Sequence, residues 1–186
     1  MDHCCLDAHR LLEQVRLHQP VVHHLTNWVT IYDCAQVVKV LGASPVMAHA
    51  PEEMDDMTGI ASALVLNIGT LTVDFVEAMK KAVARANQRG IPVVLDVCGA
   101  GATRLRDEKC FELLESGKIS IIKGNASEIA RISDLSVQTK GVDCGSCDGD
   151  LETTALDLAK ARKCVVVVTG PQDIVTDGTR VFRINN

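Results

Sequence analysis

The chain has 186 residues, of which 47% are apolar and 23% charged, and its formal net charge is −5. This composition favours one folded domain with a sizeable core and excludes an intrinsically disordered chain. Acidic residues (24) outnumber basic ones (19), and only three Phe, one Trp and one Tyr are aromatic, which argues against nucleic-acid binding. No apolar run reaches the roughly 18 residues of a membrane span, and the first residues do not resemble a secretory signal. We therefore expect a soluble cytoplasmic α/β domain with no membrane or nucleic-acid partner.

The eight cysteines predict reduced thiols rather than disulfides. Four of them lie in apolar or periodic segments and are expected to pack as small core residues: Cys34, Cys98, Cys110 and Cys164. Cys144 and Cys147 form a Cys-x-x-Cys pair in a loop rich in Gly and Asp. A zinc ribbon needs a second such pair, and a thioredoxin-like pair belongs to a βαβ unit. We interpret this pair as loop residues, with a metal or redox role as the alternative.

The first half of the chain alternates helix and strand patterns. Apolar residues recur at helical spacing in the longer segments, and proline, glycine and threonine mark helix ends. In chain order we expect a helix at 6–18, a short strand opening at 21–22, a helix at 31–41 closed by Gly42, a strand at 44–48, a helix that starts at Pro51 with Glu52 and Glu53 in its first turn, a strand at 63–69, and a helix capped by Thr72 and ending at Gly90.

The second half repeats this plan. We expect a strand at 92–96, a glycine-rich turn at 99–103, a helix through 110–114, a strand at 119–123, a helix capped by Asn125 or Ser127, a loop at 133–150, a helix at about 151–163, a strand at 164–169 and a hairpin at 173–182 around Asp177 and Gly178. Strands that are apolar throughout and separated by helices predict an α/β fold. Its central sheet should be mostly parallel and covered on both faces.

Polar residues follow several of these strands, at the sheet edge where open parallel sheets bind ligands. Asn67 and Gly69 lie at the end of one strand, and Asp96 ends the next. Lys123 and Glu128 lie at the end of the strand at 119–123 and in the helix after it. Asp96 and Glu128 could hold Mg²⁺, which takes one or two carboxylates and keeps much of its water. Lys123 could then neutralise phosphate charge.

Each of these features also has a simpler explanation. The turn at 99–103 is either a phosphate cradle or a tight connection, because it lacks a Walker A ending and Arg104 replaces the third glycine of a dinucleotide motif. Asp96 could cap a helix, and Glu128 could pair with a helix dipole. His23 and His24 favour a hydrogen-bonding pair over a metal site.

Five ordered runs resemble the hydroxyethylthiazole kinase family of the ribokinase-like superfamily. They are Val-His-His-Leu-Thr-Asn at 22–27, Leu-Gly-Ala-Ser-Pro-Val-Met-Ala at 41–48, Leu-Asn-Ile-Gly-Thr-Leu at 66–71, Asp96 with Gly-Ala-Gly-Ala-Thr at 99–103, and Lys-Gly-Asn-Ala-Ser-Glu at 123–128. The resemblance spans about residues 10–184. It implies a three-layer ribokinase-like fold and ATP-dependent phosphorylation, with Mg²⁺, of the hydroxyl of 4-methyl-5-(2-hydroxyethyl)thiazole in thiamine biosynthesis.

The resemblance also implies roles for single residues. Asn27 and Met47 would contact the thiazole, with Val29 and Gly69 nearby. Lys123, Asn125 and Thr169 would bind ATP, and Asp96 and Glu128 would organise Mg²⁺. The family forms homotrimers with active sites between subunits. In this chain Val97 and Cys98 stand where the family usually has Pro-Val, and Lys123 replaces an Arg, which keeps the charge but loses bidentate geometry.

The resemblance further implies a glycine-rich helix start after the hairpin, which forms an anion hole and carries the catalytic residue. The sequence ends at Asn186, so we expect residues 1–186 to be one kinase domain incomplete at its C-terminus. No catalytic residue is assigned, and little turnover is expected from the chain alone. One alternative is a non-catalytic nucleotide- or thiazole-binding protein. Another is a nicotinamide-dependent oxidoreductase, which the missing third glycine weakens.

Overall fold

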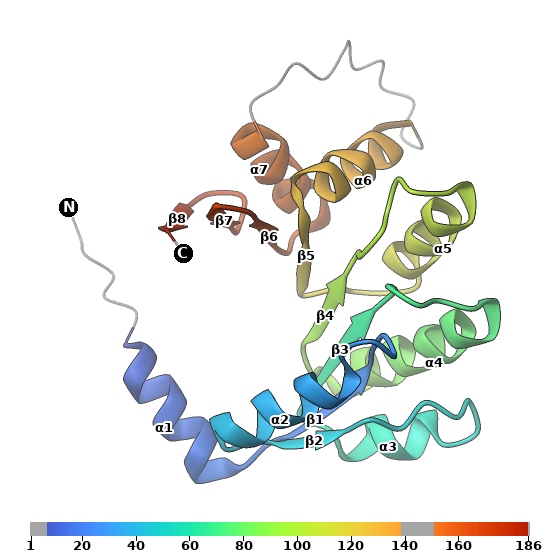
Figure 1. Cartoon of the computed structure of the whole chain (residues 1–186), viewed down its shortest axis with the longest axis vertical. Helices are drawn as coiled ribbons and strands as arrows, with labels where there is room; N and C mark the ends of the chain where they lie inside the picture. Colours follow the sequence, from blue (N-terminus) through green and yellow to red (C-terminus); the bar gives the residue numbers. More distant parts are fainter. Residues whose placement is uncertain (1–6, 139–150, 186) are drawn as a thin grey trace.

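The computed structural model describes residues 7–138 and 151–185, which form an open sheet with helices packed against it (Figure 1). The helices are α1 (Ala8–His18), α2 (Ile31–Leu41), α3 (Met54–Ile60), α4 (Val73–Arg89), α5 (Arg104–Glu115), α6 (Ala126–Gln138) and α7 (Leu151–Arg162). The strands are β1 (Val21–Leu25), β2 (Ser44–Val46), β3 (Ala63–Asn67), β4 (Val93–Asp96), β5 (Ile121–Asn125), β6 (Val165–Thr169), β7 (Gln172–Thr176) and β8 (Val181–Asn185). The Cys144 and Cys147 pair lies outside the described residues.

The eight described strands form one sheet in the order β2-β1-β3-β4-β5-β6-β7-β8. Strands β1 to β6 pair in parallel, and β7 and β8 add an antiparallel edge. Helices α3 to α7 lie on one face, whereas α1 and α2 lie on the other face beside β1 and β2 (Figure 1). The predicted α/β class, with a mostly parallel central sheet in a three-layer arrangement, is therefore confirmed.

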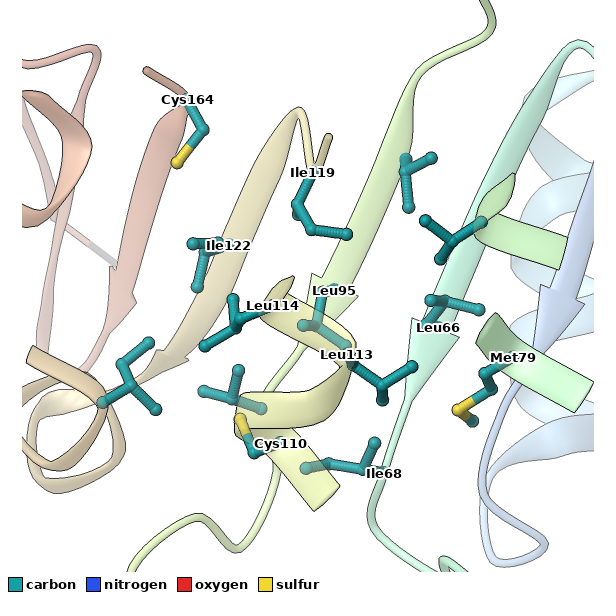
Figure 2. Packing of buried hydrophobic residues seen from close by; sticks show 14 of the residues in the cluster. Leu66, Ile68, Met79, Leu95, Cys110, Leu113, Leu114, Ile119, Ile122 and Cys164 are labelled. Carbon is teal, nitrogen blue, oxygen red and sulfur yellow. The ribbon is translucent and has the colours of Figure 1, made fainter. Parts of the chain in front are cut away.

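The core lies between the sheet and helices α4 to α7. Leu66, Leu95 and Ile122 project from neighbouring strands toward Met79 and Leu113 of the helices (Figure 2). These five side chains are fully buried. The strand residues between them, which point to the opposite face, are only partly buried. The strands read as nearly continuous apolar runs because the second face is also partly covered rather than fully open to solvent.

Two of the four cysteines in the described residues belong to this core. Cys110 and Cys164 are buried, as predicted, whereas Cys34 and Cys98 are partly exposed. All four carry free thiols. Burial raises the pKa of the Cys110 thiol to about 12 and that of the Cys164 thiol to about 11. Both are therefore unreactive packing residues, because only the thiolate is a good nucleophile.

The predicted helix ends with clear capping signals are confirmed. The Thr72 side chain accepts a hydrogen bond from the Phe75 N–H at 3.2 Å, which caps α4. Gly42 and Gly90 end α2 and α4 with φ of +98° and +67°, a conformation that favours glycine. Asp177 accepts hydrogen bonds from the turn that joins β7 and β8, as expected for the hairpin.

Several predicted boundaries are wrong. Strands β2 and β3 each end two residues before the predicted ends. Helix α3 begins at Met54 rather than Pro51, because residues 50–53 form a turn and the buried Met54 is the first residue to reach the core. Strand β5 runs to Asn125 rather than ending at residue 123, because β6 continues to pair with it. Helix α6 continues to Gln138 through part of the predicted loop, since the apolar spacing of Ile129 and Ile132 persists in the sequence.

None of the helices in the described part of the chain combines the length and apolar character required to cross a bilayer.

Candidate active site

Polar side chains gather where the central strands end. Asn67, Asp96 and Lys123 are register partners across β3, β4 and β5. Asn125 and Thr169 are partners across β5 and β6, two residues further along. Residues paired in this way project from the same face of a sheet. The structure therefore brings these five side chains to one edge and one face of the sheet, as the strand pattern predicts.

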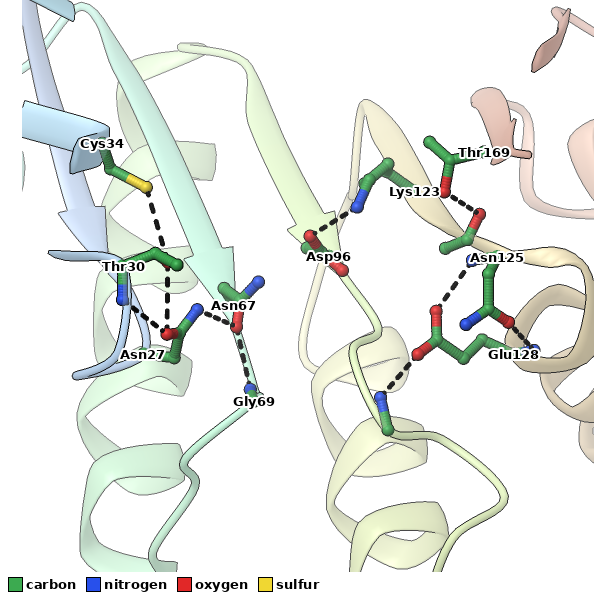
Figure 3. A network of polar contacts seen from close by, with 12 residues as sticks. Asn27, Thr30, Cys34, Asn67, Gly69, Asp96, Lys123, Asn125, Glu128 and Thr169 are labelled. Carbon is green, nitrogen blue, oxygen red and sulfur yellow. Dashed lines mark hydrogen bonds and ion pairs between the residues drawn. The ribbon is translucent and has the colours of Figure 1, made fainter. Parts of the chain in front are cut away.

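Asn27 organises the first part of this edge, in the segment after β1. Its Oδ1 accepts hydrogen bonds from the N–H groups of Val29 and Thr30, both at 3.0 Å. Its Nδ2 donates to Asn67 Oδ1 (3.1 Å), which also accepts from the Gly69 N–H (2.8 Å) (Figure 3). Two amide side chains thus tie the segment after β1 to the segment after β3. Asn27, Val29 and Gly69, predicted from family resemblance to lie near one ligand, do lie together.

The close approach at Gly69 leaves no room for a larger residue. A Cβ added there would stand 2.9 Å from Asn67 Oδ1 and 3.2 Å from Asn27 Cβ. Real Cβ contacts are essentially never shorter than 3.0 Å, so any side chain at residue 69 would displace the Asn67 amide. Glycine is therefore required here by space rather than by backbone conformation.

Asp96 and Lys123 form an ion pair at the centre of the site. Lys123 Nζ lies 3.0 Å from Asp96 Oδ2. The Asp96 side chain is 19% exposed and that of Lys123 is 39% exposed. Asp96 Oδ1 is buried and has no hydrogen-bond partner among the described residues. A buried acceptor without a donor is costly, so this oxygen is the candidate ligand atom of Asp96.

Glu128 is held by backbone groups on both sides. Its Oε1 accepts from the Gly99 N–H and its Oε2 from the Asn125 N–H, each at 2.7 Å. In return, Asn125 Oδ1 accepts from the Glu128 N–H at 3.0 Å (Figure 3). The reciprocal pair is a capping box at the start of α6. It decides that Asn125, rather than Ser127, caps this helix, and it fixes the glycine-rich turn against α6.

The glycine-rich turn is a tight connection in this structure rather than a phosphate cradle. The Gly99 N–H donates to Glu128, and the Gly101 N–H donates to Asp107 Oδ1 at 2.7 Å. The N–H groups of residues 100 and 102 donate to carbonyl groups of the same turn. Every N–H group from residue 99 to 102 is therefore already used within the protein. Gly99 and Gly101 are needed for their φ values of +81° and +90°.

Three charged residues that the sequence analysis missed support this turn. Asp107 accepts from Arg131 Nε (2.9 Å) and Nη2 (2.7 Å), which joins α5 to α6. These hydrogen bonds hold the pKa of the Asp107 carboxyl below its ordinary value against the opposing effect of burial. Arg106 reaches back from α5 to carbonyl groups after β3 and β4. Nothing in the local sequence pattern identifies these long-range partners.

The remaining predicted site residues lie at separate positions along the same edge. Val29 is 80% exposed beside Asn27. Met47 follows β2 and is partly buried, and its carbonyl oxygen lies 3.4 Å from His49 Nδ1. Thr169 ends β6, where its hydroxyl donates to the Gly124 carbonyl at 3.4 Å. The segment that carries Met47 approaches the one that carries Asn27, because the rings of His49 and Trp28 meet edge to face with their centroids 4.8 Å apart.

His23 and His24 point to different surroundings. His23 Nδ1 pairs with Thr58 Oγ1 (3.0 Å) and its Nε2 with the Ala48 carbonyl (2.8 Å), so the predicted hydrogen-bonding role holds for His23. For His24 it is wrong, because both ring nitrogens are buried without a partner among the described residues. Burial lowers the pKa of both imidazoles, with a further decrease at His24 from the neighbouring His23.

Whether Asp96 and Glu128 could hold a metal ion depends on which of their carboxylate oxygens lack a protein partner. Within the described ranges, no group of three or more His, Cys, Asp or Glu side chains could enclose a metal ion. Mg²⁺ does not require such a cage, because it binds one or two carboxylates and keeps water and substrate phosphates as its other ligands. Burial raises the pKa of the Cys98 thiol, and the charges of Asp96 and Glu128 raise it further. The free oxygen of Asp96 fits a water-rich Mg²⁺.

Comparison with known proteins assigns this arrangement to a family. Residues 12–186 match the sequence model of the hydroxyethylthiazole kinase family. The chain belongs to the hydroxyethylthiazole kinase family. It is 53% identical over 175 residues to a hydroxyethylthiazole kinase of Methanosarcina mazei, which covers 94% of this chain and 67% of the relative. A hydroxyethylthiazole kinase of Desulfatibacillum aliphaticivorans is 48% identical over 177 residues, covering 95% and 66% of the two chains.

Solved structures agree with this assignment. A hydroxyethylthiazole kinase protein from Pyrococcus horikoshii superposes with a TM-score of 0.85 at 38% identity, over 95% of this chain and 66% of that one. Adenosine kinase from Schistosoma mansoni superposes with a TM-score of 0.57 at 11% identity, over 95% and 63%, which supports the fold alone. The ribokinase-like fold predicted from the sequence is thus confirmed. The chain spans about two thirds of the length of the relatives it matches.

Proposed function

We propose that this chain provides the ligand-binding edge of an enzyme that phosphorylates the hydroxyl of 4-methyl-5-(2-hydroxyethyl)thiazole with ATP. The observation that carries the proposal is the family match over residues 12–186, together with a free carboxylate oxygen on Asp96 beside Lys123. Phosphoryl transfer depends mainly on positioning and on neutralisation of phosphate charge. An edge with one free acceptor, one ammonium group and rigid loops suits these requirements.

Asp96, Lys123, Glu128, Asn125 and Thr169 form the nucleotide side of the proposed site. Mg²⁺, when bound, would neutralise the phosphate charge that develops during transfer. Asp96 would hold the ion through its free oxygen, and Lys123 would move from Asp96 toward phosphate oxygens. Glu128 keeps a second lone pair on each oxygen, so it can accept from a metal-bound water while it retains its backbone bonds. Asn125 and Thr169 would line the nucleotide beyond the phosphates.

Asn27, Val29 and Gly69 form the thiazole side. The Asn27 and Asn67 amides fix the two segments that would hold the ring, and the bare Cα of Gly69 permits close approach. Met47 would contact the thiazole as well. The resemblance implies active sites between subunits, so we propose that Met47 of one subunit acts on a thiazole held beside Asn27 of another.

We further propose that the chain assembles as a homotrimer through α1 and α2. Large apolar side chains are exposed on these two helices: Leu11, Leu17, Tyr32, Val37, Val40 and Leu41. We call these six residues the α1–α2 apolar surface. Exposed apolar groups gathered on neighbouring helices mark an association surface more often than scattered ones do. Asn27 and Val29 directly precede α2, so association here would place a second subunit beside the thiazole.

The experiment measures ADP release that depends on both the thiazole alcohol and Mg²⁺. It is run on this chain and on a chimera in which the chain replaces the aligned part of the Methanosarcina mazei relative. Thiazole-dependent release by the chimera, and its loss in Asp96→Asn, would support the proposal. Binding of nucleotide or thiazole by both proteins without turnover would favour a non-catalytic binding protein instead. Fluorescence enhancement of NADH without ATP binding would favour an oxidoreductase.

A further inference from the structure

Arg106 joins the two halves of the site through backbone carbonyl groups. Its Nη1 donates to the Ile68 carbonyl (2.9 Å) and to the Cys98 carbonyl (3.1 Å), and its Nη2 donates to the Gly69 carbonyl (2.8 Å). Two of these carbonyls follow β3, on the thiazole side, and one follows β4, on the nucleotide side. A single partly buried guanidinium therefore bridges both segments.

The Arg106 hydrogen bonds lie just past the point where the pairing of β3 and β4 ends. Strands β3 and β4 are paired up to Asn67 and Asp96, and the last backbone contact is from the Ile68 N–H to the Asp96 carbonyl at 3.4 Å. Beyond that point no backbone hydrogen bond joins the two segments within the described residues, so their carbonyl groups need other donors. Arg106 supplies those donors. It therefore joins the segments after β3 and β4 beyond the last backbone hydrogen bond, within the proposed site.

The surrounding residues hold Arg106 in this position. Thr103 caps α5 and accepts from the Arg106 N–H at 3.3 Å, so the helix start sets where the side chain begins. A Cβ at residue 99 would stand 2.8 Å from Arg106 Nη1. Glycine at 99 therefore makes room for the guanidinium as well as for the turn. Lysine could not replace this group, because one ammonium on a flexible stem lacks the planar fork of donors.

We infer that Arg106 is a positioning residue that couples binding of the thiazole alcohol to binding of Mg-ATP. The inference rests on the proposed function, which places the thiazole beside Gly69 and Mg-ATP beside Asp96. A ligand on either side orders its own segment, and ordering a segment costs conformational entropy. Because Arg106 bonds both segments, the first ligand also orders part of the second segment. The second ligand then binds with less entropy to lose, which is positive coupling.

The test measures the Kd of the thiazole alcohol by calorimetry, with and without Mg²⁺ and a non-hydrolysable ATP analogue. The unaltered chain should bind the thiazole at least about fivefold more tightly when the nucleotide is present, the lower end of typical coupling. Arg106→Lys should reduce this factor to less than about twofold while each ligand still binds alone. Arg104→Lys is the matched control, because Arg104 is 92% exposed, pairs only with Glu108 among the contacts described, and should keep the full factor.

A second measurement uses the unaltered chain and does not depend on how the variant folds. Amide hydrogen exchange should slow at residues 98–101 when only the thiazole alcohol is bound. It should slow at residues 68–70 when only the nucleotide is bound with Mg²⁺. Protection confined to the segment that touches each ligand would overturn the inference, and so would full coupling in a folded Arg106→Lys variant. Failure of the unaltered chain to bind either ligand would contradict the proposed function, whereas binding of both without coupling would contradict this inference alone.

Discussion

At the scale of single residues, the site depends on how Asp96 and Lys123 share their charges. Lys123 offsets the negative charge of Asp96 at 3.0 Å, and yet it is 39% exposed and able to reach a ligand. Asp96 keeps one buried oxygen without a donor among the described residues. In the proposed site this pair would exchange an internal partner for an external one, which a buried and fully satisfied ion pair could not do.

Two substitutions of Lys123 should show whether ATP binding depends on its positive charge or on the geometry of its ammonium group. We expect Lys123→Ala to weaken ATP binding about 10- to 100-fold, the range that corresponds to loss of one hydrogen bond to a charged group. Lys123→Arg should retain or improve the affinity, because a guanidinium binds phosphate with two parallel bonds. Calorimetry with Mg-ATP measures both. Lys118→Ala, an exposed lysine before the opposite end of β5, is the control. Normal ATP binding by Lys123→Ala would contradict the assignment.

His24 should make the stability of the fold depend on pH. Burial lowers the pKa values of His24 and His23 below the ordinary value of 6.5. Below pH 6.5 the unfolded chain gains protons that the folded chain does not, so the free energy of unfolding falls as pH decreases toward the lowered values. Each group contributes a slope of up to about 1.4 kcal/mol per pH unit in that range. Above pH 6.5 the contribution is complete and constant.

His24→Leu should remove from this slope the contribution of one titrating group, up to about 1.4 kcal/mol per pH unit. The free energy of unfolding at pH 7 should stay equal or rise. No donor or acceptor among the described residues loses a partner in the substitution, because neither His24 nitrogen has one. Urea unfolding at pH 7.5, 6.5 and 5.5 measures the change. His9→Leu, at an imidazole with an 80% exposed side chain, should keep the original slope. An unchanged slope in His24→Leu would mean that His24 titrates normally in the folded state.

At the scale of elements, the capping box at α6 links secondary structure to the site. Glu128 accepts one N–H from its own helix cap and one from Gly99, in the turn after β4. The start of α6 and the turn therefore cannot shift independently. The same carboxylate is proposed to accept from a water on Mg²⁺, so a single side chain positions the backbone and the ion.

Glu128→Gln should reveal both roles. A glutamine amide can accept at only one end, so one N–H group loses its partner, and we expect unfolding to require about 1–2 kcal/mol less. Affinity for Mg-ATP should fall more than affinity for ATP without metal. Ser127→Ala is the control, because Ser127 bonds only to the Asn125 side chain in the contacts described. Equal losses of affinity with and without Mg²⁺ would limit Glu128 to holding the backbone.

The same elements illustrate what the sequence can predict. Thr72, Gly42 and Gly90 mark helix ends correctly, because a cap is a local interaction between neighbours in the chain. The meeting of Asp96 and Lys123 at one edge of the sheet is also predictable, since parallel strands align their carboxyl ends, although β5 runs two residues past Lys123. Arg106 escapes prediction because its partners lie up to 38 residues away. The glycine-rich turn stays ambiguous in sequence partly for the same reason, as the Gly99 N–H donates to Glu128, 29 residues further on.

At the scale of the whole molecule, the two sheet faces differ in how they are covered. Helices α3 to α7 bury one face along nearly its whole width, whereas α1 and α2 lie beside β1 and β2 on the other (Figure 1). The site residues Asp96 and Lys123 project from that second face. The α1–α2 apolar surface lies beside the outer strands β1 and β2, and Asn27 lies in the segment between β1 and α2. Association through it and ligand binding at the edge are therefore expected to be linked.

Val40→Glu should disrupt this association. Val37, Val40 and Leu41 are spaced three and four residues apart, so they share one face of α2, and Val40 is 76% exposed. A glutamate at residue 40 places a charge where a second copy would bury apolar area, and desolvating that charge opposes assembly. Light scattering after size exclusion should give a trimer mass for the unaltered chain and a monomer mass for Val40→Glu. The fold should persist, because the side chain makes little contact within its own chain.

Leu105→Glu is the matched control, because Leu105 is an apolar residue of α5 that is 45% exposed and lies away from α1 and α2. It should leave the mass unchanged. Thiazole affinity should fall in Val40→Glu and stay constant in Leu105→Glu, because Met47 is proposed to act across the subunit boundary. A monomeric mass for the unaltered chain would contradict the proposed trimer, and so would full assembly of Val40→Glu. Normal thiazole affinity in a monomeric Val40→Glu would instead place the complete thiazole site within one subunit.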